Sequence, residues 1–259
     1  MAPILSLREL ARGFVRRGRV VPALGGVSLD VAAGEFVTIV GPSGCGKSTL
    51  LNVLCGLLPP SAGQVLYKSA PVRRVNTEIG YVTQADNLYP WRTLRENVEF
   101  PLDVRGVGRA ERSRRAAALI ERVGLGGFED HYPYELSGGM RQRANIIRTL
   151  VYDPEVILMD EPFGPLDAQT RLILQDQLLG LWDAARKTIV FITHDLTEAI
   201  ALADRVVVMT ARPGRIKRVC PVPLKRPRDL FHLHDDEQFR VTYDTLWDDL
   251  AAEVRRAAE

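Results

Sequence analysis

Glu35-Phe36-Val37-Thr38-Ile39-Val40 leads directly into Gly41-Pro42-Ser43-Gly44-Cys45-Gly46-Lys47-Ser48-Thr49. The first six residues are mostly apolar, as expected of a parallel strand that is covered on both faces. Apolar residues then recur at helical spacing from Lys47 to Leu57. This order of strand, glycine-rich loop and helix matches the phosphate-loop pattern G-x-x-x-x-G-K-S/T in the structural context that the pattern requires.

The residue types of this loop suit a chain of phosphates. Glycines let the backbone curl so that N–H groups point inward, and the following helix adds the positive end of its dipole. We expect Lys47 to lie against the β- and γ-phosphates and Ser48 to give its hydroxyl to Mg²⁺. A chance match in a chain of this length has a probability of about one in a hundred at average residue usage, and the flanking strand and helix lower it further.

A second candidate for chemistry is an acidic pair, Asp160-Glu161, which follows the apolar run Val156–Met159. A buried parallel strand would deliver both carboxylates to the edge of the sheet where ligands of open α/β sheets bind. Asp160 suits the holding of Mg²⁺, and Glu161 suits activation of the attacking water as general base. Alone, the pair would equally fit a strand that leaves the core into a turn; beside a phosphate loop it indicates nucleotide hydrolysis.

A second glycine-containing segment, Leu136-Ser137-Gly138-Gly139-Met140, precedes a long helical run. Ser137 can cap this helix, and the two glycines allow an anion to approach the backbone closely. A plain helix cap would be the better interpretation of Ser-Gly-Gly alone. Its position shortly before the acidic pair favours an anion-binding role.

Along the whole chain, strand-like and helix-like runs alternate, which predicts an α/β fold. From about Asp86 to Asp153 the strand pattern fades and helical runs predict a separate helical lobe. After it, Asp195 is a predicted helix cap that forms a capping box with Glu198. A proline-rich boundary follows Cys220, and apolar residues at helical spacing predict a C-terminal helix. The predicted strands are Ile79–Val82, Val156–Asp160, Thr188–Thr193 and Arg205–Met209, and the predicted helices are Ala110–Val123, Gly138–Tyr152, Ala168–Ala185 and Leu196–Ala203.

Composition narrows the class of protein. The formal net charge is +2 over 259 residues, so no overall basic field demands nucleic acid as a partner. The N-terminal residues do not resemble a signal peptide, and no apolar run approaches the roughly 18 residues that a membrane helix needs. Three cysteines without metal-ligand spacing fit reduced thiols. We therefore expect a cytoplasmic globular protein.

Taken together, the motifs resemble those of the ATP-binding subunits of ABC transporters, from about residue 4 to residue 222. Gly41–Ser48 matches Walker A, Val156–Glu161 matches Walker B, and Leu136–Met140 resembles the signature motif. The resemblance also assigns a Q-loop glutamine, a D-loop, a switch histidine and an aromatic that stacks on adenine. These are Gln84, Gly164–Asp167, His194 and Phe14, respectively. The alternatives are that Phe14 is a packing residue of its strand and that His194 is a capping or core histidine.

This resemblance implies a P-loop NTPase core with an antiparallel β subdomain and an inserted α-helical subdomain at about residues 86–153. It implies one ATPase domain at residues 1–222 and a helical tail at residues 223–259. It further implies a head-to-tail homodimer with two ATP molecules in its interface, where Walker A (Gly41–Ser48) of one subunit faces Ser137 to Gly139 of the other. Gln84 would sense Mg²⁺, His194 would contact the γ-phosphate, and Asp167 would reach across the interface.

Three short segments of the sequence resemble one branch of this family, the importers of the nitrate/sulfonate/taurine group. The segments that carry this likeness are Asp86–Val98, Asp160–Arg171 and Met209–Ile216. The branch implies two transmembrane permease subunits, an extracytoplasmic solute-binding protein as an indirect partner, and a place at the cytoplasmic face of the membrane. Tyr89 and Trp91 lie where the permease would dock; packing inside the helical lobe is the equal alternative.

Three other functions are alternatives to this interpretation. A soluble ABC ATPase that acts on nucleic acid or ribosomes would carry tandem cassettes or a coiled coil inside the cassette, and the chain has one phosphate loop and no sustained heptads. A non-hydrolysing regulatory module is disfavoured because Glu161 and His194 are both present. A transporter ATPase for a different solute stays open, since this kind of subunit does not touch the solute.

Overall fold

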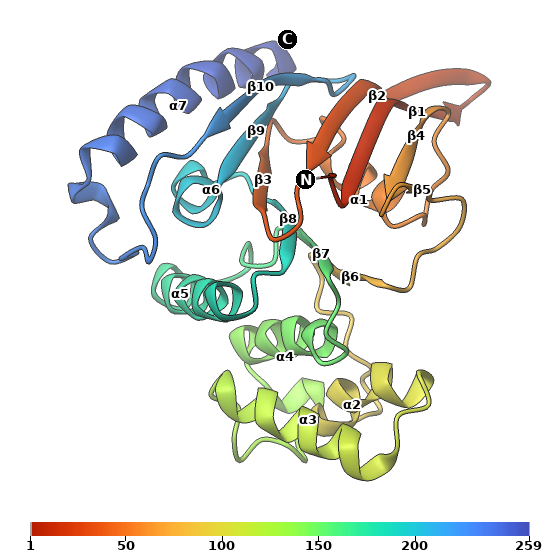
Figure 1. The fold of residues 1–259 in the computed structure, drawn as a ribbon, viewed down its shortest axis with the longest axis vertical. Coiled ribbons are helices and arrows are strands. Elements are labelled where there is room, and N and C mark those ends of the chain that lie inside the picture. The colour runs from red at the N-terminus through yellow and green to blue at the C-terminus, as the bar shows by residue number, and fades with distance from the viewer. Residues whose placement is uncertain (1, 259) are drawn as a thin grey trace.

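The computed structural model describes residues 2–258, apart from the side chains of residues 181, 184, 185 and 258. Its centre is a sheet of six strands in the order β10-β9-β3-β8-β7-β6 (Figure 1). Five strands run parallel, and β10 pairs antiparallel with β9 at one edge. The strands are β3 (Phe36–Val40), β6 (Ile79–Val82), β7 (Val156–Asp160), β8 (Thr188–Ile192), β9 (Arg205–Met209) and β10 (Ile216–Pro221).

One face of this sheet packs against helix α1 (Lys47–Leu54) and a smaller antiparallel sheet. The smaller sheet has the order β2-β1-β4-β5. Val37 and Ile39 of β3 point into this layer and are fully buried there. The strands of the smaller sheet are β1 (Leu5–Arg16), β2 (Arg19–Val31), β4 (Ala62–Tyr67) and β5 (Ala70–Pro71).

The opposite face is covered by three helices, α5 (Ala168–Ala185), α6 (Leu196–Leu202) and α7 (Glu237–Ala258). Phe36 and Val40 point to this side, because successive side chains of a strand alternate between its faces. Burial on both faces explains why β3, β7 and β8 are fully buried along their length. Figure 1 shows α7 lying alongside β9 and β10, so the C-terminal segment is part of this layer.

Helices α2 (Leu94–Val104), α3 (Arg109–Arg122) and α4 (Gly138–Leu150) form a separate group at one end of the molecule (Figure 1). They pack around their own apolar core, which includes Leu94, Val98, Ile120 and Ile147. A short 3-10 turn, Pro133–Glu135, precedes α4. A capping box starts α2: the Thr93 side chain accepts from the Glu96 N–H, and the Glu96 carboxylate accepts from the Thr93 N–H.

The predicted α/β class is confirmed, and the predicted strands and helices all form with small shifts at their ends. The helix predicted to reach Leu57 ends at Leu54, because Gly56 adopts a left-handed backbone with φ 79°. The capping box predicted at α6 is wrong. Asp195 does cap this helix, but its N–H donates to Thr193 Oγ1, and the Glu198 carboxylate accepts from Gln175 instead. Among the helices of residues 2–258, none combines the length and apolarity needed to cross a bilayer.

Candidate nucleotide site

Three neighbouring strands of the large sheet carry the candidate residues to one edge. The phosphate loop follows β3, Glu161 directly follows β7, and His194 comes shortly after the end of β8. Because β8 lies between β3 and β7 and all three run parallel, their carboxyl ends meet at this edge. A cavity of about 480 Å³ opens there and is lined by Ser43, Gly44, Gly46, Lys47, Ser48, Thr49, Gln84 and Glu161, together with Phe14, Arg16, Val21, Ala23 and Arg212.

The phosphate loop is tightly curled. Gly46 has φ 105°, and a Cβ there would lie 2.8 Å from the Ala23 carbonyl oxygen, so only glycine fits. Lys47 is buried, and its Nζ donates to the carbonyls of Gly41 at 2.8 Å and Pro42 at 3.3 Å. In the described residues no carboxylate pairs with this buried ammonium. The loop therefore presents a buried ammonium group beside the cavity, and its contact with phosphates stays a prediction.

Asp160 is buried at the end of β7, beside Ser48 and Tyr81. Burial raises the pKa of its carboxyl group, and the nearby Glu161 charge adds to this, while a hydrogen bond from Ser48 opposes it. A buried carboxylate is a good ligand for a small divalent cation. Ser48 and Asp160 are 112 positions apart in the chain and yet lie side by side, and their holding of Mg²⁺ stays a prediction.

Glu161 adopts a left-handed backbone with φ 44°, which is strained for a residue with a side chain. Its N–H donates to the Ile192 carbonyl at 3.0 Å, which ties the end of β7 to the end of β8. The side chain consequently meets His194: Glu161 Oε2 lies 3.1 Å from His194 Nδ1. The structure brings together the two residues that were predicted from separate motifs, in the geometry of a base with its orienting partner.

Gln84 and Phe14 both line the cavity, from the loop after β6 and from β1 respectively. Phe14 is 39% exposed, and the Arg12 guanidinium lies 5.0 Å from its ring centroid. The alternative that Phe14 is a packing residue of its strand stays open, because the ring also packs against Arg12. Stacking on adenine stays a prediction, which the position of the ring in the cavity wall supports.

Ser137, Gly138, Gly139 and Asp167 do not line this cavity. Ser137 caps α4, where its Oγ accepts from the Met140 N–H at 3.3 Å. Asp167 caps α5, and hydrogen bonds from Thr170 and Gln169 hold the pKa of its carboxyl group below the usual range. The starts of the two helices are neighbours, since a Cβ on Gly139 would lie 3.2 Å from Thr170. These residues form a second surface, away from the phosphate loop of the same chain.

The two aromatic residues after Gln84 behave differently. Tyr89 is half-buried, with its ring 4.8 Å from that of Phe100 in an edge-on arrangement and 5.6 Å from that of Trp91. Trp91 is 70% exposed. Tyr89 thus packs partly against the lobe, and docking to a partner stays a prediction for both rings.

Sequence reasoning missed several residues of the cavity, above all Arg16 and Arg212. Arg212 lies in the loop between β9 and β10, and its guanidinium donates to the Gly44 carbonyl. No local motif marks it, because the contact joins residues 168 positions apart.

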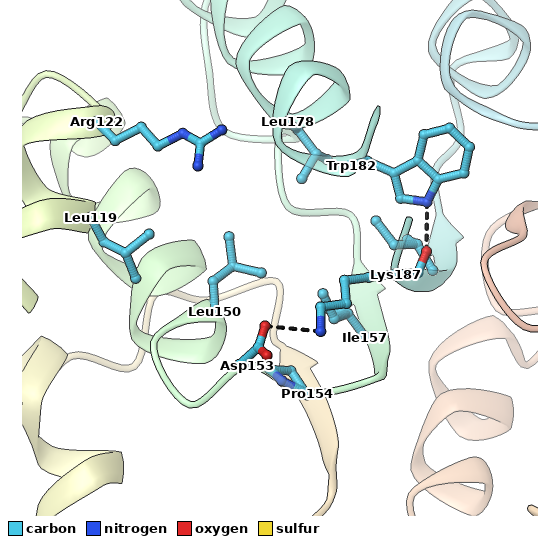
Figure 2. A pocket seen from close by; sticks show the side chains of 10 residues that line it. Leu119, Arg122, Leu150, Asp153, Pro154, Ile157, Leu178, Trp182 and Lys187 are labelled. Atoms are coloured by element: carbon cyan, nitrogen blue, oxygen red, sulfur yellow. Dashed lines mark hydrogen bonds and ion pairs between the residues drawn. The ribbon is translucent and has the colours of Figure 1, made fainter. Parts of the chain in front are cut away.

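A second cavity of about 330 Å³ lies between the helical group and the large sheet (Figure 2). Leu119, Leu150 and Leu178 give it an apolar lining. At its rim, Lys187 Nζ lies 2.9 Å from Asp153 Oδ1, and Trp182 Nε1 donates to the Lys187 carbonyl at 2.6 Å. This cavity contains no phosphate-loop residue, so it is distinct from the nucleotide site.

The fold and the first cavity define a nucleotide hydrolase with a phosphate loop, and comparisons with known proteins specify which kind. Residues 24–164 match the ABC transporter family model. The chain is 51% identical over 225 residues to an uncharacterized ABC transporter ATP-binding protein of Methanocaldococcus jannaschii, covering 87% of this chain and 84% of that protein. The chain therefore belongs to the ABC transporter family of ATP-binding proteins, and it is an ABC-type ATPase.

Two further similarities refine this picture. The chain is 47% identical over 195 residues to the taurine import ATP-binding protein TauB of Yersinia pestis, covering 75% of this chain and 76% of TauB. It also resembles a solved ATP-binding cassette described as dimeric, in a post-hydrolysis state bound to ADP and Pi. That likeness has a TM-score of 0.77 and 33% identity, and it covers 85% of this chain and 100% of the cassette.

Proposed function

We propose that this chain powers the import of nitrate-, sulfonate- or taurine-type solutes by hydrolysing ATP at the cytoplasmic face of the membrane. The observation that carries the ATPase part is the convergence of Lys47, Asp160, Glu161 and His194 on one edge of the sheet. The likeness to a taurine import protein supports the solute class. The proposed architecture is an ATPase domain at residues 1–222, which includes the helical group, followed by the tail at 223–259.

In the proposed reaction, each residue acts from the position that the structure gives it. Lys47 and the N–H groups of Gly41–Thr49 hold the phosphates, and Phe14 stacks on the adenine ring. Glu161 accepts the proton of the attacking water, while His194 holds the Glu161 carboxylate from 3.1 Å and faces the γ-phosphate. Ser48, Asp160 and Gln84 would hold Mg²⁺, which neutralises phosphate charge when bound.

We further propose a head-to-tail homodimer. The cavity of one chain contains no residue of the segment Ser137–Gly139. A second copy that offers its Ser137 segment and Asp167 would close each site, because helix α4 presents N–H groups and a positive dipole end there. ATP would then hold the two subunits together, and hydrolysis would release them.

Gel filtration with light scattering tests this arrangement. Glu161→Gln, with ATP and Mg²⁺, should run as a dimer, and with ADP as a monomer. Adding Ser137→Arg should abolish the dimer but leave ADP affinity unchanged, because Ser137 lies outside the cavity of its own chain. A loss of ADP affinity in monomeric Ser137→Arg would contradict the head-to-tail arrangement.

The proposed partners in the membrane are two permease subunits, with an extracytoplasmic solute-binding protein as an indirect partner and no nucleic acid. Trp91, exposed beside the helical group, is the proposed anchor for the permease, since large aromatic side chains contribute strongly at the centre of interfaces. Purification of tagged Glu161→Gln from gently solubilised native membranes should recover a polytopic permease. Ribosomal or nucleic-acid partners without a permease would refute the transporter proposal.

A further inference from the structure

The loop Thr210–Arg215, between β9 and β10, brings Arg212 to the mouth of the nucleotide cavity. Arg212 Nη2 and Nε donate to the Gly44 carbonyl oxygen at 3.1 Å and 3.3 Å. The guanidinium group lines the cavity and is exposed to solvent. The guanidinium group therefore lies next to the phosphate loop. Its remaining N–H groups are available to a ligand.

Backbone contacts fix this loop in place. The Gly214 N–H donates to the Ala23 carbonyl at 2.9 Å, and the Gly25 N–H donates to the Gly214 carbonyl at 3.0 Å. A Cβ on Gly214 would lie 2.2 Å from the Cys45 carbonyl oxygen, so the loop touches the phosphate loop directly and needs glycine there. Arg212 therefore lies in a loop whose backbone is held in place by contacts with β2 and with the phosphate loop.

The C-terminal helix supports the same loop through Glu253. Its Oε2 accepts from the Ala211 N–H at 3.0 Å, immediately before Arg212 in the chain. Its Oε1 lies 3.2 Å from Lys217 Nζ and 2.9 Å from Arg256 Nη1. Glu253 is only 1% exposed, which is unusual for a carboxylate and indicates a structural purpose.

The charges around the cavity favour an anion beside Arg212. Arg16, Lys47 and Arg212 line the cavity against one carboxylate, Glu161. In the part of the chain that the structure describes, no carboxylate oxygen lies within 4 Å of the Arg212 guanidinium. The guanidinium N–H groups that do not donate to Gly44 suit the oxygen atoms of a phosphate chain.

We propose that Arg212 is a further nucleotide-binding residue that contacts the phosphate chain of ATP and ADP, and that Glu253 on α7 is its positioning residue. The inference rests on the proposed assignment of the cavity to ATP. It gives the C-terminal helix a role in nucleotide affinity beyond packing on the sheet.

Calorimetric titration of the full chain with MgADP tests Arg212. Arg212→Ala should weaken binding by about fivefold to tenfold, as expected for one solvent-exposed, charge-assisted contact. Arg212→Lys should recover part of the loss. The matched control is Arg215→Ala, which removes the same charge from the same loop outside the cavity and should stay within about twofold of wild type. The difference in MgADP affinity between wild type and Arg212→Ala should decrease in high salt, because salt screens an exposed charge.

A double-mutant cycle tests Glu253. Glu253→Ala should weaken MgADP binding, and adding it to Arg212→Ala should cause little further loss, because both changes remove one contact. Glu253→Gln keeps an acceptor for the Ala211 N–H and should restore affinity. The effect should appear in Kd for ADP and in KM for ATP with kcat nearly unchanged.

The outcomes separate this inference from the proposed function. If Lys47→Ala abolishes ADP binding while Arg212→Ala binds like wild type, the nucleotide site stands and the role of Arg212 is refuted. If Arg212→Ala weakens binding and the Glu253 effects simply add to it, the positioning role of Glu253 is refuted. If wild type does not bind ADP, or Lys47→Ala binds equally well, both proposals fail.

Discussion

Glu198, in helix α6 directly after the His194 loop, should make the stability of the protein depend on pH. It is 5% exposed, and its Oε1 accepts from Gln175 Nε2 at 2.8 Å. Burial raises the pKa of its carboxyl group from 4.5 to about 7, with the Asp195 charge adding to the effect and hydrogen bonds from Thr193 and Gln175 opposing it. Between these two pH values the folded protein keeps a proton that the unfolded chain has released.

The sign and size of the effect follow from this difference. Between pH 4.5 and about pH 7 the folded protein binds more protons than the unfolded chain. The stabilisation from Glu198 is therefore fully present below pH 4.5, decreases as the pH rises, and levels off above pH 7. At about 1.4 kcal/mol for each pKa unit, the loss is about 3 kcal/mol. Glu198→Gln cannot ionise, so its stability advantage over wild type should be small at pH 5 and grow to about 3 kcal/mol at pH 8.

Urea unfolding of both proteins at pH 5, 6, 7 and 8 measures this difference, with Trp182, buried beside Phe36, as the fluorescent reporter. In thermal scans the gain at pH 8 should be roughly 6 to 12 °C. Glu78→Gln, an exposed change in the loop before β6, is the control and should show no pH-dependent difference. A Glu198→Gln effect that is the same at pH 5 and pH 8 would refute the reasoning.

Three further predictions concern the site and its surroundings. Asp160→Asn should keep the fold but raise the Mg²⁺ concentration needed for half-maximal ATP turnover by tenfold or more, on the order expected for loss of a ligand carboxylate; an unchanged Mg²⁺ titration would remove Asp160 from the metal site. Gly214→Ala should destabilise the protein by roughly 1–3 kcal/mol in urea unfolding, because the new Cβ would overlap the Cys45 carbonyl; wild-type stability would show that the loop yields freely. Trp91→Ala should leave the ATPase activity and melting temperature of the isolated subunit unchanged but lower the yield of co-purified permease; equal yields would argue against Trp91 as an anchor.

The local chemistry of the site could be predicted because its parts are contiguous in the chain. Nine successive residues, Gly41–Thr49, contain the glycines, the lysine and the hydroxyls that a phosphate loop needs, and a strand and a helix flank them. Asp160 and Glu161 were recognisable because a buried strand runs straight into them. In each case the backbone between the important atoms is short, so the sequence constrains their relative positions.

Other predictions failed or stayed open where a distant partner decides the outcome. Glu198 has the spacing of a capping box, yet Gln175 on α5 provides a hydrogen bond in the core and takes its carboxylate away from Asp195. Tyr89 and Trp91 are two positions apart and equally apolar, but Phe100 on α2 covers one and not the other. No local pattern encodes these choices.

The sequence by itself determined that the chain is an α/β protein with a phosphate loop, an acidic pair at the end of a strand and a helical insertion, because hydrophobic periodicity and short motifs express local backbone preferences and contiguous chemistry. Only the tertiary structure decided that Glu161 meets His194, that Ser137 lies outside the cavity of its own chain, and that Arg212 reaches Gly44. The first of these contacts depends on the order of strands in the sheet. The contact between Arg212 and Gly44 depends on two loops that are more than a hundred residues apart in the chain, and only the fold as a whole brings them together.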